Sequence, residues 1–388
     1  MKKIILLLFV LYITLVSGQG KRFFESGAAE LKNPVEKINL TYIHQIPLVK
    51  VWINNKSYQF IFDTGAPTVI STEIYNELNL KKKHRTKVGD SQKNKQEQIF
   101  TKLPEMKVDN VIFTNVGAIV IDLKGPKFGC MNIDGIIGAN QMAKLFWRIN
   151  YSENLIEATN DFNNFSTEGY ETIFGFKPKP QKTPVIESEI LDKNVELTFD
   201  TGFTGKLKVS ENNYDPKNGK VKFVEMYGTN SVGAFGAGKP ISSYIFKADD
   251  IIIEGQKFEN EIIMTGNSNL IGNEFFERFK FILDWQNNKI YMQRIKNNPV
   301  KLESFGFGYR FIDLKAVVVM VFREKDFPLK TDDIILSINN VSFENLNAES
   351  SCHYFLNRVE KETDSIDIKV KRDGKVLDFK LDKKEYLN

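Results

Sequence analysis

The stretch Phe62-Asp63-Thr64-Gly65 closes a hydrophobic strand, and Phe199-Asp200-Thr201-Gly202 repeats it later in the chain. Each copy predicts a carboxylate on a tight turn at the end of a strand. Glycine lets the backbone approach that carboxylate, and backbone amides can then donate hydrogen bonds to it. One Asp-Thr-Gly arises easily by chance, whereas two copies after similar strands, 137 residues apart (200 − 63), indicate a pair of related sites.

A second pair of segments repeats with nearly the same spacing. Ile136-Ile137-Gly138 follows the first turn and Leu270-Ile271-Gly272 follows the second, 134 residues apart (272 − 138). An internal duplication with a three-residue difference (137 − 134) explains both offsets. The alternative, two unrelated sheets that happen to look alike, accounts less simply for two matched pairs.

Composition indicates an ordinary globular protein. A chain of 388 residues suggests two or three domains, and a hydrophobic fraction of 42% predicts a sizeable core. The net charge of +4 falls to +2 without Lys2 and Lys3, so it gives no reason to expect nucleic acid or an anionic membrane as a partner.

Residues 1–18 have the pattern of a secretory signal, with Lys2-Lys3 before an apolar run and a small-residue site at Val16-Ser17-Gly18. The run of 13 residues from Ile4 to Val16 is too short to span a bilayer. We therefore expect an exported protein without a membrane span, in the periplasm, at the cell surface or secreted.

Cys130 and Cys352 are the only cysteines, and we assign them to different domains. Two cysteines exclude a disulfide framework, and with three scattered histidines they do not make a metal site. Export without disulfides fits a bacterial periplasm or surface better than an animal secretory pathway.

The two repeats resemble a bilobal aspartic protease of the pepsin and retropepsin superfamily, over about residues 38–295. The resemblance implies a mostly β fold, with two duplicated β lobes around a cleft, and Asp63 and Asp200 as the catalytic pair. It also implies supporting roles at both turns and in the segments packed behind them, at Thr64, Gly65, Thr68, Thr201, Gly202, Thr204, Ile137, Gly138, Ile271 and Gly272.

Two carboxyl groups within hydrogen-bonding distance cannot both ionise cheaply, so they share one proton. The ionised partner takes a proton from water, which attacks the peptide carbonyl, and the protonated partner donates to the carbonyl oxygen. Both aspartates lie in one chain. We therefore expect a monomer that acts on a peptide or protein substrate without a metal or other cofactor.

Some positions depart from the pattern of that superfamily. Ala66-Pro67 follows the first triplet, where many pepsin-like members have Ser or Thr. Thr68 stands where a hydroxyl often bonds the first aspartate, whereas the second copy has Gly205 at that register. The flaps that would cover substrate are not obvious. In the second half the candidate is the Gly-rich stretch Tyr227-Gly228-Thr229-Asn230-Ser231-Val232-Gly233, and in the first half it is Val88-Gly89-Asp90-Ser91, which lacks a tyrosine.

The C-terminal segment resembles a small α+β bacterial PDZ domain. The loop Gly306-Phe307-Gly308-Tyr309 would offer amides to a peptide C-terminus, and the run Asp332-Asp333-Ile334-Ile335-Leu336-Ser337-Ile338-Asn339 supports the match. The alternative is a small β-rich domain without a ligand. The predicted boundaries are a leader at 1–18, a lead-in at 19–37, an N-terminal protease lobe at 38–176, a connector at 177–184, a C-terminal protease lobe at 185–295 and a PDZ-like domain at 302–385.

Two functions fit these patterns. The first is an exported aspartic endopeptidase whose PDZ domain docks peptides or regulates access. The second is a catalytically inactive protein that binds peptides in the cleft and the PDZ groove. The presence of both Asp63 and Asp200 favours the enzyme.

Overall fold

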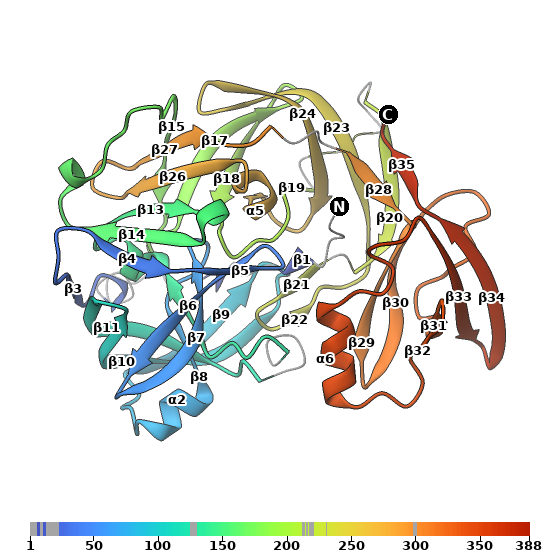
Figure 1. The fold of residues 1–388 in the computed structure, drawn as a ribbon, viewed down its shortest axis with the longest axis horizontal. Helices are drawn as coiled ribbons and strands as arrows, with labels where there is room; N and C mark the ends of the chain where they lie inside the picture. The colour runs from blue at the N-terminus through green and yellow to red at the C-terminus, as the bar shows by residue number, and fades with distance from the viewer. Residues whose placement is uncertain are drawn as a thin grey trace.

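The computed structural model describes residues 6–7, 11–12, 23–124, 130–211, 214, 216, 221–229, 231–297 and 301–388. Over this part of the chain the protein is mostly β-structure with a few short helices, as the sequence predicts. Figure 1 shows most of the C-terminal strands, in deep orange and red, beside the rest of the chain, whose colours run from blue to light orange.

The first repeat forms a sheet of ten strands within the described residues, and it carries Asp63 at the end of a central strand. Helix α2 (Thr72–Glu77) follows that strand, and the Ser71 side chain caps it by accepting from Ile74 N, as predicted. The strands of this sheet are β2 (Leu11–Tyr12), β3 (Ala28–Glu30), β5 (Thr41–Ile43), β6 (Ile46–Ile53), β7 (Lys56–Asp63), β8 (Val69–Ser71), β9 (His84–Asp90), β10 (Lys95–Val108), β11 (Val111–Ile121) and β12 (Gly135–Gly138).

The second repeat and the C-terminal segment share one sheet, of fourteen strands where the chain is described. From the second repeat come β16 (Lys177–Pro178), β17 (Pro184–Ile190), β18 (Lys193–Phe199), β19 (Leu207–Ser210), β20 (Phe223–Gly228), β23 (Ile241–Ile253), β24 (Gln256–Gly266) and β25 (Leu270–Ile271). From the C-terminal segment come β29 (Phe307–Ile312), β30 (Lys315–Phe322), β31 (Ile334–Ile338), β32 (Val341–Ser342), β33 (Ser365–Arg372) and β34 (Lys375–Asp382).

A third sheet takes strands from both repeats. Strand β13 (Phe146–Asn150) of the first repeat pairs antiparallel with β26 (Phe279–Asp284) of the second, with Trp147 opposite Leu283. The other strands of this sheet are β4 (Glu36–Asn39), β14 (Leu155–Thr159), β15 (Thr172–Gly175) and β27 (Lys289–Arg294). Because one ladder crosses between the repeats, this sheet fixes their relative position.

The strands around the two Asp-Thr-Gly turns pair in the same way. In the first repeat β7 lies parallel to β12, and β12 lies antiparallel to β8. In the second, β18 lies parallel to β25, and β25 lies antiparallel to β19. The sequence repeat is therefore also a repeat of strand pairing. Short helices follow the two inner strands, α4 (Ala139–Met142) and α5 (Asn273–Phe276), and the 3-10 helices are Tyr151–Glu153 and Phe162–Asn164.

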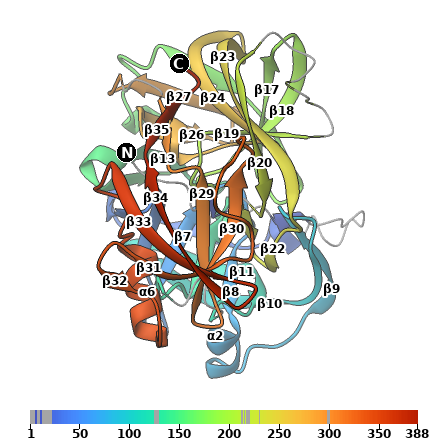
Figure 2. The same ribbon diagram turned by 90° about the vertical axis from the view of Figure 1, so that its right-hand side faces the viewer.

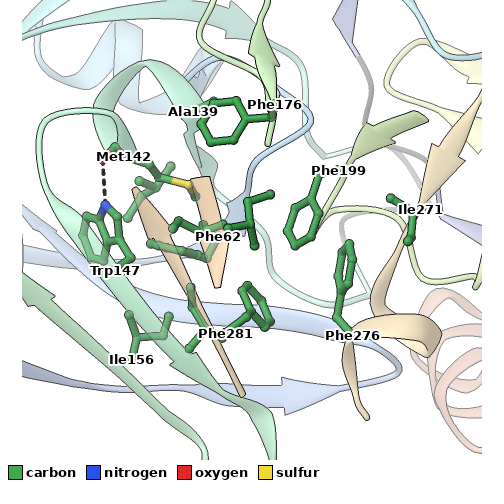
Figure 3. Packing of buried hydrophobic residues seen from close by; sticks show 14 of the residues in the cluster. Phe62, Ala139, Met142, Trp147, Ile156, Phe176, Phe199, Ile271, Phe276 and Phe281 are labelled. Carbon is green, nitrogen blue, oxygen red and sulfur yellow. Dashed lines mark hydrogen bonds between the residues drawn. The ribbon is translucent and has the colours of Figure 1, made fainter. Parts of the chain in front are cut away.

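A continuous hydrophobic core lies beneath both turns (Figure 3). Phe62 and Phe199, which directly precede the aspartates, are both fully buried in it. Phe199 stacks on Phe276 with ring centroids 4.0 Å apart, and Phe62 meets Trp147 edge-on at 5.0 Å. Aromatic packing of this kind holds the ends of β7 and β18 in place.

The C-terminal segment joins the rest of the protein through strand pairing. Strand β30 pairs antiparallel with β20, with Tyr227 opposite Val321, and Figure 2 shows the two strands side by side. Its helix α6 (Ala348–Leu356) begins with a capping box at Asn347. Strands β28 (Leu302–Ser304) and β35 (Lys384–Tyr386) form a separate pair.

Cys130 and Cys352 form a disulfide, which corrects the expectation that the two cysteines stay unpaired in different domains. Their separation of 222 residues gives no sign of proximity, since a disulfide depends on where the fold brings two side chains. Phe355 and Leu356 of α6 pack against the apolar cluster of the first repeat, which places Cys352 beside Cys130. With this disulfide, the cysteines give no reason to prefer a bacterial compartment to an animal secretory pathway.

The lead-in is more ordered than its polar sequence suggests. Phe23 and Phe24 are buried in the first repeat, and Ala28–Glu30 pairs as β3 with β11. The predicted leader, 1–18, lies outside the described residues apart from Leu6–Leu7 (β1) and Leu11–Tyr12 (β2). In the described segments, no helix has the length and apolar character needed to cross a membrane.

Candidate active site

The two predicted aspartates lie next to each other at the ends of two strands. Strand β7 ends at Asp63, and β18 ends at Phe199, one residue before Asp200. Both side chains are 0% exposed, so the site forms on the buried ends of two central strands rather than on surface loops.

The two threonines join the turns by reciprocal hydrogen bonds. Thr64 Oγ1 donates to Phe199 O at 2.6 Å, and Thr201 Oγ1 donates to Phe62 O at 2.7 Å. Each hydroxyl also accepts from the other threonine's backbone N–H, at 3.0 Å in both directions. Four buried hydrogen bonds therefore hold the first turn against the second.

The two glycines allow the carboxyl groups to cross to the opposite turn. Gly65 N donates to Asp63 Oδ1 at 2.7 Å, and Gly202 N donates to Asp200 Oδ1 at 2.9 Å. A Cβ on Gly65 would overlap the carboxyl group of Asp200, and a Cβ on Gly202 would overlap that of Asp63. Each carboxyl group thus lies against the other turn's backbone, and only glycine fits there.

One oxygen of each aspartate remains without a donor. Asp63 Oδ2 and Asp200 Oδ2 are buried, and no N–H or hydroxyl group of the described residues donates to either oxygen. Buried polar atoms in folded proteins are nearly always paired, so two such oxygens at one place indicate a site for shared protons, water or a substrate group.

Burial raises the pKa values of both aspartates. Burial raises the pKa of Asp63 well above the ordinary value for Asp, and the neighbouring Asp200 raises it further. Burial also raises the pKa of Asp200, to about 7, although the amide of Gly202 and the hydrogen bond with Asp63 act in the opposite direction. The pair therefore retains a proton at a pH where isolated carboxyl groups would be ionised.

The predicted motif behind the pair lies in the strands next to the two turns. Gly138 is opposite Asp63 in the β7–β12 ladder, and Asp200 N donates to Ile271 O at 3.0 Å. A Cβ on Gly138 would overlap the backbone of Pro67, and a Cβ on Gly272 would overlap Phe203 O. These two glycines allow each turn to pack directly on the strand behind it.

Two asparagines that the sequence did not single out support the turns. Asn140 Oδ1 accepts from Thr68 N at 2.7 Å and from Thr68 Oγ1 at 2.9 Å. The hydroxyl of Thr68 thus donates its one proton to Asn140 instead of Asp63. In the second repeat Asn273 Nδ2 donates to Thr201 O at 2.7 Å, and Asn273 Oδ1 accepts from Tyr151 Oη at 2.8 Å. The second-repeat candidate Thr204 is buried next to this turn.

The hairpin that contains the second-half flap candidate contacts the first-half candidate. Gly228 ends β20, and the chain continues into β21 (Ser231–Gly233) and β22 (Gly236–Ala237). Phe235 N, in the turn between β21 and β22, donates to Asp90 Oδ2 at 2.9 Å, and Asp90 belongs to the first-half candidate. Figure 1 shows β21 and β22 between the first repeat and the C-terminal strands.

Each candidate flap has an edge on which an extended chain pairs. Leu6–Leu7 pairs in parallel with Ser231 and Val232 of β21. Leu11–Tyr12 pairs antiparallel with Gly89 and Asp90 of β9. The backbone groups at both edges are thus available for strand addition.

The loop predicted to bind a peptide carboxylate makes most of its described contacts with other residues of the C-terminal segment. Gly306 has a positive φ of 81°, and its N–H donates to Ser304 Oγ at 3.0 Å. Phe307 and Tyr309 are buried in the core of the C-terminal segment. Tyr309 Oη donates to Glu360 Oε2 at 3.0 Å, and Gly308 lies opposite Met320 in β30.

Residues 49–140 match a family model described as aspartyl protease. The matched stretch includes Asp63, Gly65 and the Ile137-Gly138 segment behind them, and it supports aspartyl protease chemistry in general. The matched stretch ends before the second repeat. Asp200 is therefore assigned to the site by the hydrogen bonds and close contacts between the two turns, not by the family model. A search of curated proteins finds no match to the chain. The described residues contain no group of three or more His, Cys, Asp or Glu side chains arranged to hold a metal ion.

Proposed function

We propose that this protein is an aspartic endopeptidase whose catalytic residues are Asp63 and Asp200. The observation that carries the proposal is the reciprocal crossing of the two Asp-Thr-Gly turns, in which each carboxyl group packs against the glycine of the other turn. Such crossing brings together two carboxyl groups that share a proton, and a shared proton is what water-mediated peptide hydrolysis requires.

The two aspartates divide the acid and base roles. Asp63, whose pKa is raised by burial and by Asp200, holds the proton and donates it to the carbonyl oxygen of the peptide. Ionised Asp200 takes a proton from water, and the water oxygen attacks the carbonyl carbon. Asp200, now protonated, donates to the amide nitrogen as the C–N bond breaks, and Asp63 takes a proton back from the gem-diol hydroxyl, which restores the starting protonation of the pair. The Gly65 and Gly202 amides keep each Oδ1 in place, so that the Oδ2 atoms face the reacting groups.

The substrate we propose is a peptide in extended conformation. Strands β9 and β21 each pair with a short segment of the predicted leader, which supports binding by strand addition on both sides. Removal of residues 1–18 on export would free both edges for substrate. Export, a monomeric state and peptide docking by a PDZ-like C-terminal domain belong to this proposal and rest on the sequence patterns given above.

A second candidate function is a peptide-binding protein without catalysis. The strand edges of β9 and β21 would serve that function equally well. The two buried Oδ2 atoms favour the enzyme, because a binding groove has no use for two adjacent carboxyl groups whose pKa values are raised.

The test uses the purified mature chain with a fluorescently labelled unfolded protein as substrate. We expect cleavage that a statine-type inhibitor blocks and that Asp63→Asn or Asp200→Asn abolishes. Asp382→Asn, which neutralises an exposed carboxyl group on β34, is the matched control and should cleave normally. Inhibitor binding without any cleavage between pH 3 and pH 8 would favour the binding protein instead.

A further inference from the structure

Lys208 is a fully buried lysine at the start of a hydrogen-bond chain between the two repeats. Its Nζ donates to Ser231 Oγ at 2.9 Å, and Ser231 Oγ donates to Gln92 Oε1 at 3.0 Å. Lys208 lies in β19, Ser231 in β21 and Gln92 in the turn between β9 and β10. All three side chains are buried, so a continuous internal chain connects both candidate flaps to the sheet that carries Asp200.

The position in the first repeat that is equivalent to Lys208 holds a valine, Val69. Val69 pairs with Ile136, and Lys208 pairs with Leu270, at matching places in the two β ladders. Val69 is also fully buried, so packing at this position is satisfied by an apolar side chain. Lysine is rarely buried unless it has a specific partner. The second repeat nevertheless has a buried lysine at this position, whereas the first repeat has a valine.

A second difference between the repeats makes room for the lysine. Gly266 lies opposite Ser210 in the β19–β24 ladder, and a Cβ there would overlap Lys208 Cε. The equivalent of Gly266 in the first repeat is Ile121, which lies opposite Ser71. The glycine and the lysine thus form a matched pair of departures from the duplicated pattern.

Burial of Lys208 lowers the stability of the folded protein at neutral pH. Burial lowers its pKa to about 7, and Glu211 is the charged group that acts in the opposite direction. Because the unfolded chain binds this proton up to a pH of about 10, the buried lysine destabilises the fold at neutral pH. A group that lowers stability and is nevertheless accommodated by its surroundings is typical of a functional position.

Lys208, where the hydrogen-bond chain begins, lies near the strand that leads to Asp200. Leu270 of β25 is opposite both Lys208 and Thr198, which places Lys208 two strands away from Thr198, about 10 Å at the usual strand spacing. Around the hydrogen-bond chain the two hairpins make further contacts. Asn94 Nδ2 donates to Ala237 O at 3.3 Å, in addition to the bond between Phe235 and Asp90.

We propose that Lys208 is a positioning residue that, through Ser231 and Gln92, ties the two hairpins together above the site. Peptide paired with β9 and β21 is then held at a fixed height over Asp63 and Asp200. This inference rests on the proposed function. Its mechanical part, the tie between the hairpins, holds whether or not the protein hydrolyses peptides.

The test compares Lys208→Met with the wild-type chain in three measurements. Met has a similar length and no charge, so the urea midpoint at pH 7 should rise. Amide hydrogen exchange at residues 88–94 and 231–237 should become about tenfold faster, because a charge-assisted hydrogen bond is lost. The KM for the labelled substrate should rise about tenfold or more with kcat little changed, which corresponds to the loss of that one bond in binding.

Lys206→Met is the matched control. Lys206 is largely buried nearby and forms an ion pair with Glu261 Oε2 at 3.4 Å, away from both hairpins. It should change stability without affecting hairpin exchange or KM. Gln92→Ala breaks the tie from its other end and should reproduce the exchange and KM effects of Lys208→Met.

Two outcomes would overturn the inference. One is hairpin exchange in Lys208→Met equal to that of the wild type, and the other is an equal KM increase in Lys206→Met. If the wild-type chain neither cleaves nor binds the inhibitor, the proposed function fails, and the exchange comparison still decides whether Lys208 ties the hairpins.

Discussion

Cys130, in the turn before β12, is joined to Cys352 of α6 by a disulfide that closes 222 residues of chain. The bond connects the C-terminal segment to the first repeat, whereas β30 connects it to the second. The C-terminal segment is therefore attached to both repeats.

The first prediction concerns this disulfide. Replacing both cysteines by serine should lower the free energy of unfolding by up to about 5 kcal/mol, because a loop of 222 residues is no longer closed in the unfolded chain. Urea unfolding measures the effect. Dithiothreitol should lower the midpoint of the wild type and leave that of the double variant unchanged. Equal midpoints for both proteins in oxidising buffer would contradict the prediction.

The second prediction concerns the threonine bonds between the two turns. Thr64→Val removes the donor to Phe199 O and the acceptor for Thr201 N, both of which are buried. Leaving buried backbone groups unpaired costs about 1–3 kcal/mol each, so stability and cleavage should both fall. Thr64→Ser keeps the hydroxyl and should retain most of both. A Val variant that cleaves as well as the Ser variant would show that the bonds do not hold the turns.

The third prediction concerns the dependence of stability on pH. The pKa of Asp200 rises from about 4 in the unfolded chain to about 7 in the fold, so the folded protein binds the extra proton between these values. Stability therefore falls as the pH rises from about 4 to 7. Asp200→Asn should unfold at a higher urea concentration than the wild type at pH 7, and the gain should vanish near pH 3. The exposed control Asp382→Asn should show no such gain, and a gain that is equal at both pH values would contradict this assignment.

The fourth prediction concerns Gly228 at the end of β20. Its φ is 129°, and a Cβ there would overlap Val319 O in the adjacent strand β30. Gly228→Ala should therefore separate β20 from β30, lowering the urea midpoint and speeding amide exchange in both strands. Gly374 is the matched control, since its φ is 79° and nothing lies within 4 Å of a Cβ there. Gly374→Ala should cost only the strain of a positive φ, about 1–2 kcal/mol. Equal losses for the two variants would contradict the role of the β20–β30 contact.

Much of the central geometry could be predicted from local sequence. Two strands that end in Asp-Thr-Gly, with hydrophobic-Gly segments behind them, locate Asp63, Asp200, Gly138 and Gly272 because each depends on its immediate neighbours. The cap at Ser71 is predicted for the same reason. Features of this kind follow from local backbone geometry.

Features that depend on distant contacts were missed. Asn140 follows Gly138 by two residues, whereas Asn273 follows Gly272 by one, so comparing the repeats by position hides their shared role. Lys208 lies between Leu207 and Val209, and such an apolar-polar-apolar alternation is typical of a strand with one exposed face. The structure buries all three residues, because β19 is covered on both faces. The pairing of the cysteines depends in the same way on where α6 docks.

The attachment of the C-terminal segment has a practical consequence for producing the protein. A truncation that ends near residue 297 would leave the edge of β20 without a neighbour and Cys130 as an unpaired thiol. Exposed strand edges recruit other chains, and free thiols cross-link in air. Such a fragment should aggregate during purification, so crystallisation and assays are best attempted with the intact C-terminus.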